Sequence, residues 1–332
     1  MKKYAIFGAD GAGKIVFETL GAENVLCFVD NYKKGQKYLE KDIIDIESLV
    51  EMHNDVLLIV TSDAFSEICR DLKKMVQKVT YYIWTKDSAI RNRIKAPPPN
   101  TIPLELLNDY TMNGLIPVLY WYFMEDKTGG GNRNSATAYE IAFKNLEDKT
   151  FQYYGEDINS FYAAFERYNL EGKSVLVWGL AGINCEAMAI WQGAEHVYVV
   201  DYNKPVCEHD KITVMNHEEL AKSGIKTDVA ISFSSFEHDG LGRYGDPLNP
   251  NGDLEAMQSA GNFLKDNGCL WLGVPQGQDC LVWNAHRIYG EKRLPLLLKG
   301  WDIETVFGPR PPSGSLGSFV QPLMILRKLK NE

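Results

Sequence analysis

The ten residues from Glu237 to Asp246 are the part of this sequence with the most chemically capable side chains. They place carboxylates, an imidazole, a guanidinium and a phenol among three glycines: Glu237, His238, Asp239, Arg243, Tyr244 and Asp246. An imidazole is the usual general base for a hydroxyl near neutral pH, and a guanidinium binds a carboxylate or phosphate through two parallel hydrogen bonds. A glycine-rich polar loop is often only a tight turn, but a turn does not need this set of side chains. We therefore predict a small-molecule site here.

The position of this stretch in the chain supports the same prediction. It follows Val229–Phe236, an apolar run that predicts a buried strand, and ligands of open α/β sheets lie where such strands end in loops. We assign the catalytic role to His238, with Glu237 to orient it and His286 as the second candidate base. The predicted substrate-binding residues are Asp239, Arg243, Tyr244, Asp246, Asn284 and Arg287. For His286 and Arg287 the alternative is a buried hydrogen-bond network that ties a loop to a helix.

A glycine turn at Trp178–Glu186 predicts a cofactor site in the same part of the chain. Glycines allow the backbone to approach a ligand, and the helix that follows offers free N–H groups. The next strand ends at Asp201, whose carboxylate can accept both hydroxyls of a ribose in nicotinamide enzymes and in methyltransferases alike. The turn departs from G-x-G-x-x-G, and Val177 stands where methyltransferases commonly carry an acid. The predicted cofactor-binding residues are Gly179, Gly182, Asp201, Tyr202 and Phe233.

A second glycine turn lies near the amino terminus, at Gly8–Lys14. Its G-x-x-x-x-G-K spacing is that of a P-loop, but Ile15 follows where a P-loop needs a Ser or Thr to hold magnesium. We interpret it as a Rossmann-type turn. The residues predicted to hold a nucleotide or nucleotide-sugar are Gly8, Gly11, Gly13 and Asp30. The alternative is a scaffold that keeps these glycines for backbone reasons alone.

Alternating strand and helix patterns predict the elements that position these residues. The fold class is α/β with two Rossmann-like doubly wound sheets, a small amino-terminal one and a larger carboxyl-terminal one. We place the small domain at residues 1–85, a Pro-rich linker at 86–103, and the larger domain at 104–332. The larger domain opens with a helical extension, for which Leu104–Phe123 is the first predicted helix.

Composition restricts the partners. The net charge is −9 and basic residues form no long run, so nucleic acid is a poor partner. No apolar run approaches the ~20 residues that span a bilayer, which predicts a cytoplasmic protein without a membrane span. The six cysteines are dispersed, which indicates neither disulfides nor a zinc site, and we predict no metal. The expected partner is a small molecule, with homo-oligomer formation left open.

Residues from about 173 to 326 resemble a class I S-adenosylmethionine-dependent methyltransferase domain. Gly179 and Gly182 match its glycine loop and Asp201 its ribose-binding position. Within that superfamily, three separated signatures are similar to an uncharacterised domain-of-unknown-function family: Gly240–Pro247 (GLGRYGDP), Gly273–Pro275 and Asn284–Tyr289. Residues 1–85 resemble the Rossmann-like domain that precedes the catalytic part of some sugar acyltransferases, through Ile6–Gly13 and Phe28–Asn31.

The resemblance implies an enzyme, a methyltransferase that uses S-adenosylmethionine. With the amino-terminal match, the expected acceptor is a small sugar-linked molecule of surface polysaccharide biosynthesis. Two other functions stay open: an NAD(P)-dependent or sugar-nucleotide-modifying enzyme, because two glycine turns each precede an acidic strand end, and a nonenzymatic ligand-binding module, because Val177 and Ile183 depart from the motif.

Overall fold

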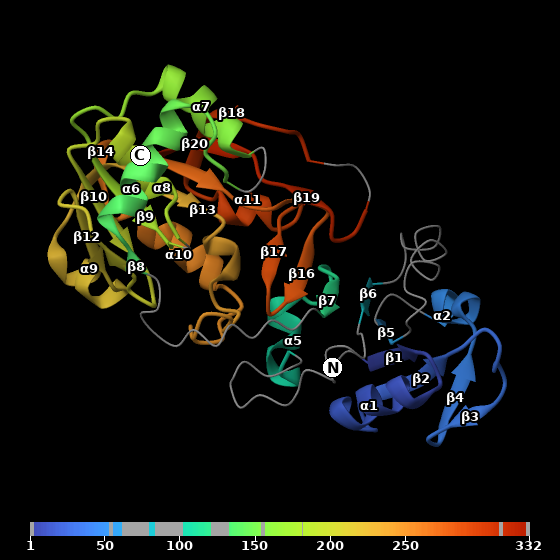
Figure 1. Cartoon of the computed structure of the whole chain (residues 1–332). Coiled ribbons are helices and arrows are strands. Elements are labelled where there is room, and N and C mark those ends of the chain that lie inside the picture. The colour runs from blue at the N-terminus through green and yellow to red at the C-terminus, as the bar shows by residue number, and fades with distance from the viewer. Residues whose placement is uncertain are drawn as a thin grey trace. The chain divides into compact units, whose positions relative to one another are not determined.

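Short Val- and Ile-rich runs form the strands of two main sheets, one in each part of the chain (Figure 1). The computed structural model describes residues 3–52, 56–61, 80–83, 102–120, 133–153, 157–180, 182–311 and 315–329. The chain divides into two compact units: Met1–Phe123 with Cys280–His286, and Met124–Asp279 with Arg287–Glu332. The α/β fold class with two main sheets is thereby confirmed, and the sheet of the second unit, which has fewer strands but more residues in strands, is the larger one.

The first unit is built on a largely parallel sheet. Its strands are β1 (Lys3–Phe7), β2 (Val25–Val29), β3 (Lys37–Tyr38), β4 (Lys41–Ile44), β5 (Val56–Val60), β6 (Thr80–Ile83), β7 (Val118–Tyr120) and β16 (Cys280–Trp283). They lie in the order β16-β7-β6-β5-β1-β2-β4-β3, with only β3 antiparallel to its neighbour among these pairs. The described helices of this unit are α1 (Gly11–Leu20), α2 (Ile46–Met52) and α5 (Leu104–Tyr110). Most of the predicted linker at 86–103 lies outside the described residues.

The helix predicted over Leu104–Phe123 was wrong beyond its first two turns. Helix α5 ends at Tyr110, and Asn113 and Gly114 follow with φ of 58° and 83°, in the left-handed region that ends helices. Pro117 then disfavours helical backbone at the residue before it, and Val118–Tyr120 forms strand β7. The segment therefore contributes a strand to the first sheet.

The second unit contains a seven-stranded mixed sheet in the order β12-β10-β9-β13-β14-β20-β18. The strands are β9 (Ser174–Trp178), β10 (His196–Val200), β12 (Ile212–Met215), β13 (Thr227–Phe233), β14 (Leu264–Gly273), β18 (Trp301–Phe307) and β20 (Leu323–Lys328). The first five pair in parallel, whereas β20 runs antiparallel to both β14 and β18. Because β12, β10, β9, β13 and β14 are parallel, their carboxyl ends meet at one edge of the sheet.

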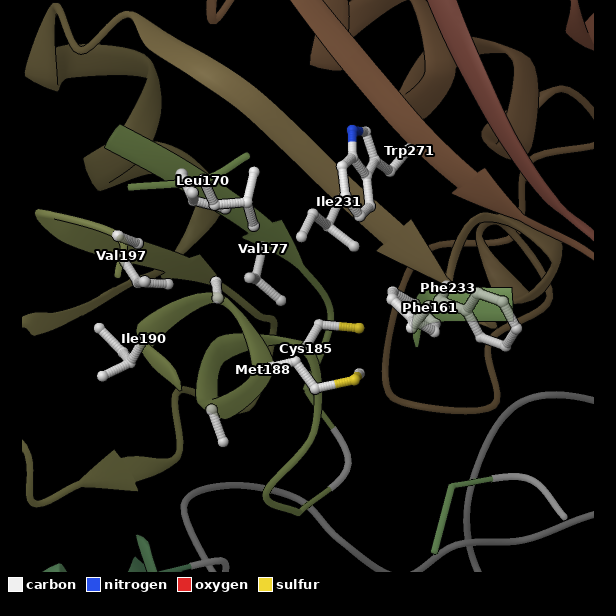
Figure 2. Close-up of a cluster of buried hydrophobic side chains, with 14 of the residues drawn as sticks. Phe161, Leu170, Val177, Cys185, Met188, Ile190, Val197, Ile231, Phe233 and Trp271 are labelled. Atoms are coloured by element: carbon white, nitrogen blue, oxygen red, sulfur yellow. The ribbon is translucent and has the colours of Figure 1, made fainter. Parts of the chain in front are cut away.

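Helices cover both faces of this sheet because its strands are apolar on both sides. They are α6 (Ala136–Glu147), α7 (Ile158–Arg167), α8 (Cys185–Trp191), α9 (His217–Ser223), α10 (Gly252–Gly261) and α11 (Leu294–Leu297). On β9, Val175 and Val177 face the core under α6, α7 and α8, while Leu176 and Trp178 face the core under α9, α10 and α11. Figure 2 shows the first of these cores, where Cys185 and Met188 of α8 lie near Val177.

Shorter elements complete the two units. They are β8 (Arg133–Asn134), β11 (Val206–Cys207), β15 (Gln276–Gly277), β19 (Phe319–Val320), β17 (His286–Ile288) and the 3-10 turn η2 (Phe236–His238). Strand β8 pairs with β11, and β15 pairs with β19. Strand β17 follows β16 and carries the chain from the first unit into the second.

Candidate functional site

The glycine turn and Asp201 come together at the carboxyl edge of the larger sheet. Strands β9 and β10 are paired in parallel, so the residues that follow them are neighbours. The Leu180 N–H donates to Asp201 Oδ2 at 2.9 Å, and the Asn203 N–H donates to Asp201 Oδ1 at 2.7 Å. The Asp201 carboxylate therefore faces the glycine turn rather than bulk solvent. A carboxylate offers about four lone-pair positions, so each oxygen keeps one for a further donor.

Gly179 is required by close packing at the start of this turn. Its φ is +79°, and a Cβ atom there would lie 2.3 Å from the Ser235 hydroxyl oxygen. The turn after β9 therefore lies against the segment that follows β13, the strand that pairs with β9 on the side opposite to β10. Gly182 also has a positive φ of 94°, but a Cβ there would meet no other atom within 4 Å. Its conformation, not crowding, favours glycine.

Tyr202 extends the site from β10 toward the predicted catalytic loop. Nearly half of its surface is exposed (47%), and its ring lies 4.3 Å from that of His217 between centroids. Burial of the phenol raises the pKa of Tyr202 above its usual range, and the carboxylates of Asp239 and Asp246 add to the rise. Asp201, Tyr202 and the loop therefore share one edge of the second unit.

The loop predicted to be catalytic, residues 234–246, begins with strained backbone. Ser234, the residue after β13, has a φ of 54°, which costs a non-glycine residue of order 1 to 3 kcal/mol. Its hydroxyl donates to Glu237 Oε1 at 2.8 Å. The imidazole Nε2 of His238 lies 3.6 Å from the same oxygen, and its ring packs edge-on against Tyr244 at 5.4 Å between centroids. Glu237 and His238 are thus adjacent, as the orienting role of Glu237 requires.

The two acids on either side of His238 both hold protons more tightly than free carboxyl groups do. Burial raises the pKa of Glu237 to about 7, and the Ser234 hydroxyl and Arg243 only partly oppose this. Its Oε2 atom has no hydrogen-bond partner among the described residues. Burial, with Asp246 adding to it, raises the pKa of Asp239 well above its usual range. These perturbed carboxyls are typical of a functional site.

Asp246 folds the loop. Its Oδ2 accepts the N–H groups of Gly240 at 2.7 Å and Gly242 at 3.0 Å, and its Oδ1 accepts that of Tyr244 at 3.3 Å. The side chain is nearly buried, so this geometry favours a structural role over the predicted substrate contact. Arg243 instead places its guanidinium 5.0 Å from the centroid of the Tyr244 ring.

The loop offers a matched pair of glycine substitutions. A Cβ at Gly240 (φ +80°) would lie 2.0 Å from the Asn249 carbonyl oxygen, whereas one at Gly245 (φ +89°) would meet nothing within 4 Å. Gly245→Ala should cost only the backbone strain, about 1 to 2 kcal/mol of unfolding free energy. Gly240→Ala should cost more, because backbone must move. Urea unfolding of both variants checks this, and equal losses would contradict the close packing.

Arg287 lies in a buried network, which favours the alternative considered for it. It is 3% exposed and donates to the carbonyls of Asp239 at 2.6 Å and Glu237 at 3.3 Å. Its guanidinium also faces Asp253, at 3.6 Å, and Arg293 binds both oxygens of that carboxylate at 2.6 and 2.8 Å. The guanidinium of Arg287 thus binds the backbone carbonyls of the loop. Asp253 and Arg293 were not predicted, and no local pattern marks them.

Phe233, Asn284 and His286 are the other predicted site residues. Phe233 is 6% exposed and packs against Tyr153 and Phe161 at 5.3 and 5.2 Å between centroids, so its ring belongs to the core (Figure 2). Asn284 and His286 belong to the first unit. Asn284 is fully buried there.

A buried acid that the sequence did not reveal supports the glycine turn. Glu186, in the first turn of α8, accepts the Tyr139 hydroxyl of α6 at 3.0 Å and the Asn184 N–H at 3.0 Å. Asn134 reaches the same turn, donating to the Gly182 carbonyl at 3.2 Å. The one signal in the sequence is an acid directly after the turn. Burial raises the pKa of Glu186 to about 7.

These raised pKa values predict how stability depends on pH. A carboxyl whose folded pKa lies above its unfolded value of 4.5 contributes stability that is fully present below pH 4.5 and is lost as pH rises through about 7. For Glu186 the loss is about 3 kcal/mol. Glu186→Gln should therefore have a flatter profile than wild type in urea unfolding between about pH 5 and pH 8. Parallel profiles would contradict a neutral Glu186.

In the amino-terminal glycine turn, a side chain of the turn itself accepts the N–H groups at the start of the helix. Asp10 Oδ1 accepts the N–H groups of Ala12 and Gly13 at 2.9 and 3.0 Å, so a carboxylate occupies the helix start where a phosphate would bind. A Cβ at Gly13 would lie 2.0 Å from the Gly8 carbonyl oxygen, whereas Gly11 has open space. Asp30 accepts the N–H groups of Tyr32 and Lys33 at 3.0 and 3.2 Å. This geometry favours the scaffold alternative; a ligand there stays a prediction.

The described residues contain neither a metal-binding cluster of His, Cys, Asp or Glu nor a membrane-spanning helix. Within those ranges, no group of three or more His, Cys, Asp or Glu side chains could hold a metal ion. Among the helices that the structure describes, none is long and apolar enough to cross a membrane.

Solved structures with distant likeness to this chain include a ribosomal protein methylase and TehB. The ribosomal protein L11 methylase from Lactobacillus delbrueckii subsp. bulgaricus is 11% identical over 54% of this chain and 81% of its own, with a TM-score of 0.33. TehB from Haemophilus influenzae is 13% identical over 56% of this chain and 67% of its own, with a TM-score of 0.36. No curated protein matches the sequence. Likeness at this level says nothing of activity.

Family models match both parts of the chain and confirm the sequence-based recognition. Residues 172–313 match the family described as "Caenorhabditis protein of unknown function, DUF268", and residues 1–80 match the family described as "C2185-like, N-terminal". The first match contains the glycine turn, Asp201 and the whole catalytic loop. The second contains the turn at Gly8–Lys14. The DUF268 match thus covers every strand of the seven-stranded mixed sheet except β20, and the C2185-like match covers strands β1 to β5 of the first sheet.

Proposed function

We propose that this protein is a methyltransferase that transfers the methyl group of S-adenosylmethionine to a small acceptor. The observation that carries the proposal is the Asp201 carboxylate, which is turned onto the glycine turn with a lone pair left on each oxygen. Two ribose hydroxyls would fit those positions. S-adenosylmethionine supplies an activated methyl group on a sulfonium.

The residues of the loop support the acceptor side of this proposal. His238 lies at the end of β13, and β13 pairs with the β9 strand that carries the glycine turn. A neutral imidazole can take the proton of an acceptor hydroxyl at Nδ1, because its Nε2 atom faces the orienting Glu237. Tyr202, Arg243 and Tyr244 would then bind and orient the acceptor, and proximity would supply much of the rate. A sugar-linked hydroxyl compound is the first acceptor class to test.

Titration calorimetry tests the cofactor assignment directly. Folded wild-type protein should bind S-adenosylmethionine with a Kd well below about 1 mM. If no heat of binding appears at millimolar ligand, the proposal is wrong. NADPH is the comparison ligand, because a shift of its fluorescence on mixing, without S-adenosylmethionine binding, would support the nicotinamide alternative. Mass analysis of extracts incubated with isotopically labelled S-adenosylmethionine would identify the acceptor.

His238→Ala should slow methyl transfer at least about 100-fold while leaving the Kd for S-adenosylmethionine unchanged, because a general base acts on the acceptor and not on the cofactor. The measurement pairs single-turnover rates with calorimetry. His196→Ala is the control, since that imidazole lies at the start of β10, the end of the strand opposite to Asp201, and bonds the Thr213 hydroxyl. If binding and rate fall together in His238→Ala, His238 is structural.

A further inference from the structure

A second cavity lies at the opposite edge of the larger sheet, where its parallel strands begin. Its volume is about 420 Å³, within the range of small-molecule sites. Lys173 precedes β9, Asp228 and Val229 begin β13, and Arg327 closes β20, whose antiparallel direction brings its end to this edge. The Lys265–Gly268 segment of β14 forms another wall. The cavity therefore does not belong to the site built around Asp201.

Two of the three cations that line this cavity are already matched by acids. Lys265 Nζ lies 2.8 and 2.9 Å from the two oxygens of Asp228, which also accepts the Ser174 hydroxyl. Although burial opposes it, these bonds lower the pKa of Asp228 to about 2. Arg327 binds Glu304 at 2.6 Å and the Asn267 carbonyl at 2.7 Å. The charges of Lys265 and Arg327 are therefore already paired within the protein.

Lys173 is the third cation that lines the cavity. It is partly buried, and no carboxylate of the described residues lies within ion-pair distance of its ammonium group. The other lining acid, Asp266, is exposed. Partial burial strengthens the attraction of an ammonium group for an anion, because less solvent screens the pair. Lys173 is therefore available to a ligand that carries negative charge.

The wall beside these charges is aromatic. Trp271 is fully buried, its ring packs edge-on to Tyr168 at 6.0 Å between centroids, and both residues line the cavity with Leu170. The indole N–H of Trp271 has no oxygen or nitrogen acceptor among the described residues. Because Trp271 and Leu170 are fully buried, an apolar or planar group of a ligand would contact the partly exposed Tyr168 while its charge lies on the polar side.

We propose that this cavity binds a small molecule that combines an oxyanion, either carboxylate or phosphate, with an apolar or aromatic group. The oxyanion binds Lys173 and the apolar group packs against the partly exposed Tyr168. The site is separate from the proposed methyl-transfer site, so it holds neither the cofactor nor the acceptor of that reaction.

The test uses two probes on the full chain, phenyl phosphate and benzoate, with benzyl alcohol as the neutral comparison. At least one anion should bind with a Kd on the order of 1 mM, and benzyl alcohol should bind more weakly. The tighter anion identifies the oxyanion class. Lys173→Gln should weaken that binding about tenfold, since a charge-assisted hydrogen bond is lost. Because Lys173 forms no side-chain ion pair among the described residues, this variant should unfold at the wild-type urea concentration.

Lys299→Gln is the matched control, because Lys299 is exposed and lies outside the cavity. It should bind both probes as wild type does. Absence of binding by either anion to wild type, or equal affinity in Lys173→Gln and wild type, would overturn the proposal. Asp201→Ala should leave probe binding unchanged, so the result is independent of the cofactor assignment.

Discussion

Asp201→Ala should bind S-adenosylmethionine more than about tenfold more weakly than wild type, because charge-assisted hydrogen bonds to the ribose are lost. The carboxylate lies at the carboxyl end of β10 with one lone pair of each oxygen uncommitted to the backbone. Titration calorimetry of the purified variant is the measurement. If the affinity is retained, the ribose site lies elsewhere and the proposed cofactor geometry is wrong.

The control for Asp201→Ala must separate lost ligand contacts from a disturbed turn, because Asp201 also holds the N–H groups of Leu180 and Asn203. Asp201→Asn keeps one carbonyl acceptor and should still bind more weakly than wild type. Asp302→Ala removes an exposed carboxylate on the edge strand β18 and should bind normally. Thermal unfolding of all three variants then shows whether any loss of affinity follows a loss of folding.

Asp253→Ala should lower the free energy of unfolding by about 3 to 5 kcal/mol, because it leaves two buried guanidinium groups without their carboxylate. Asp253 is fully buried between Arg287 and Arg293 and accepts the Tyr289 hydroxyl at 3.0 Å. Burial alone would raise the pKa of Asp253, but the two guanidinium groups hold it below its usual range. Urea unfolding at neutral pH measures the loss.

Glu218→Ala is the matched control for Asp253→Ala. It breaks the ion pair between Glu218 and Lys222, whose side chains are 75% and 73% exposed. An exposed pair of this kind contributes about 0.3 to 0.5 kcal/mol, because solvent screens it and two long side chains must be ordered. Similar losses in the two variants would contradict the buried network. Asp253→Ala should also loosen the loop at residues 237–246. Arg287, which then lacks its carboxylate partner, binds the backbone carbonyls of Glu237 and Asp239.

Local sequence pattern was sufficient for the buried strands and for the site's main components. Strands β9 and β10 directly precede the glycine turn and Asp201, as predicted, because a parallel strand buried on both faces is a continuous apolar run with polar residues at its ends. The positions of the glycine turn and of Asp201 follow, since both come directly after such strands. The sequence also predicts which reactive side chains the loop at residues 237–246 carries, because those residues lie close together in the chain.

Local sequence pattern did not predict the elements in which apolar and polar residues are mixed. Strand β18 lies at the sheet edge and exposes most of its residues, so it lacks a continuous apolar run. Strand β7 follows an apolar segment that also fits a helix, and pairing with β6 and β16 decides its conformation. A short apolar segment takes the conformation that its neighbours in space can pair with.

Sequence by itself thus determined the fold class, the strands that carry the site and the types of its reactive residues. Only the tertiary structure decided which of those residues can meet a ligand. It turned Arg287 and Asp246 toward the backbone of the loop, put Phe233 in the core, and joined Glu186 to Tyr139 across 47 residues. The physical reason is that burial and long-range hydrogen bonding depend on how distant segments pack, and no local spacing encodes that packing.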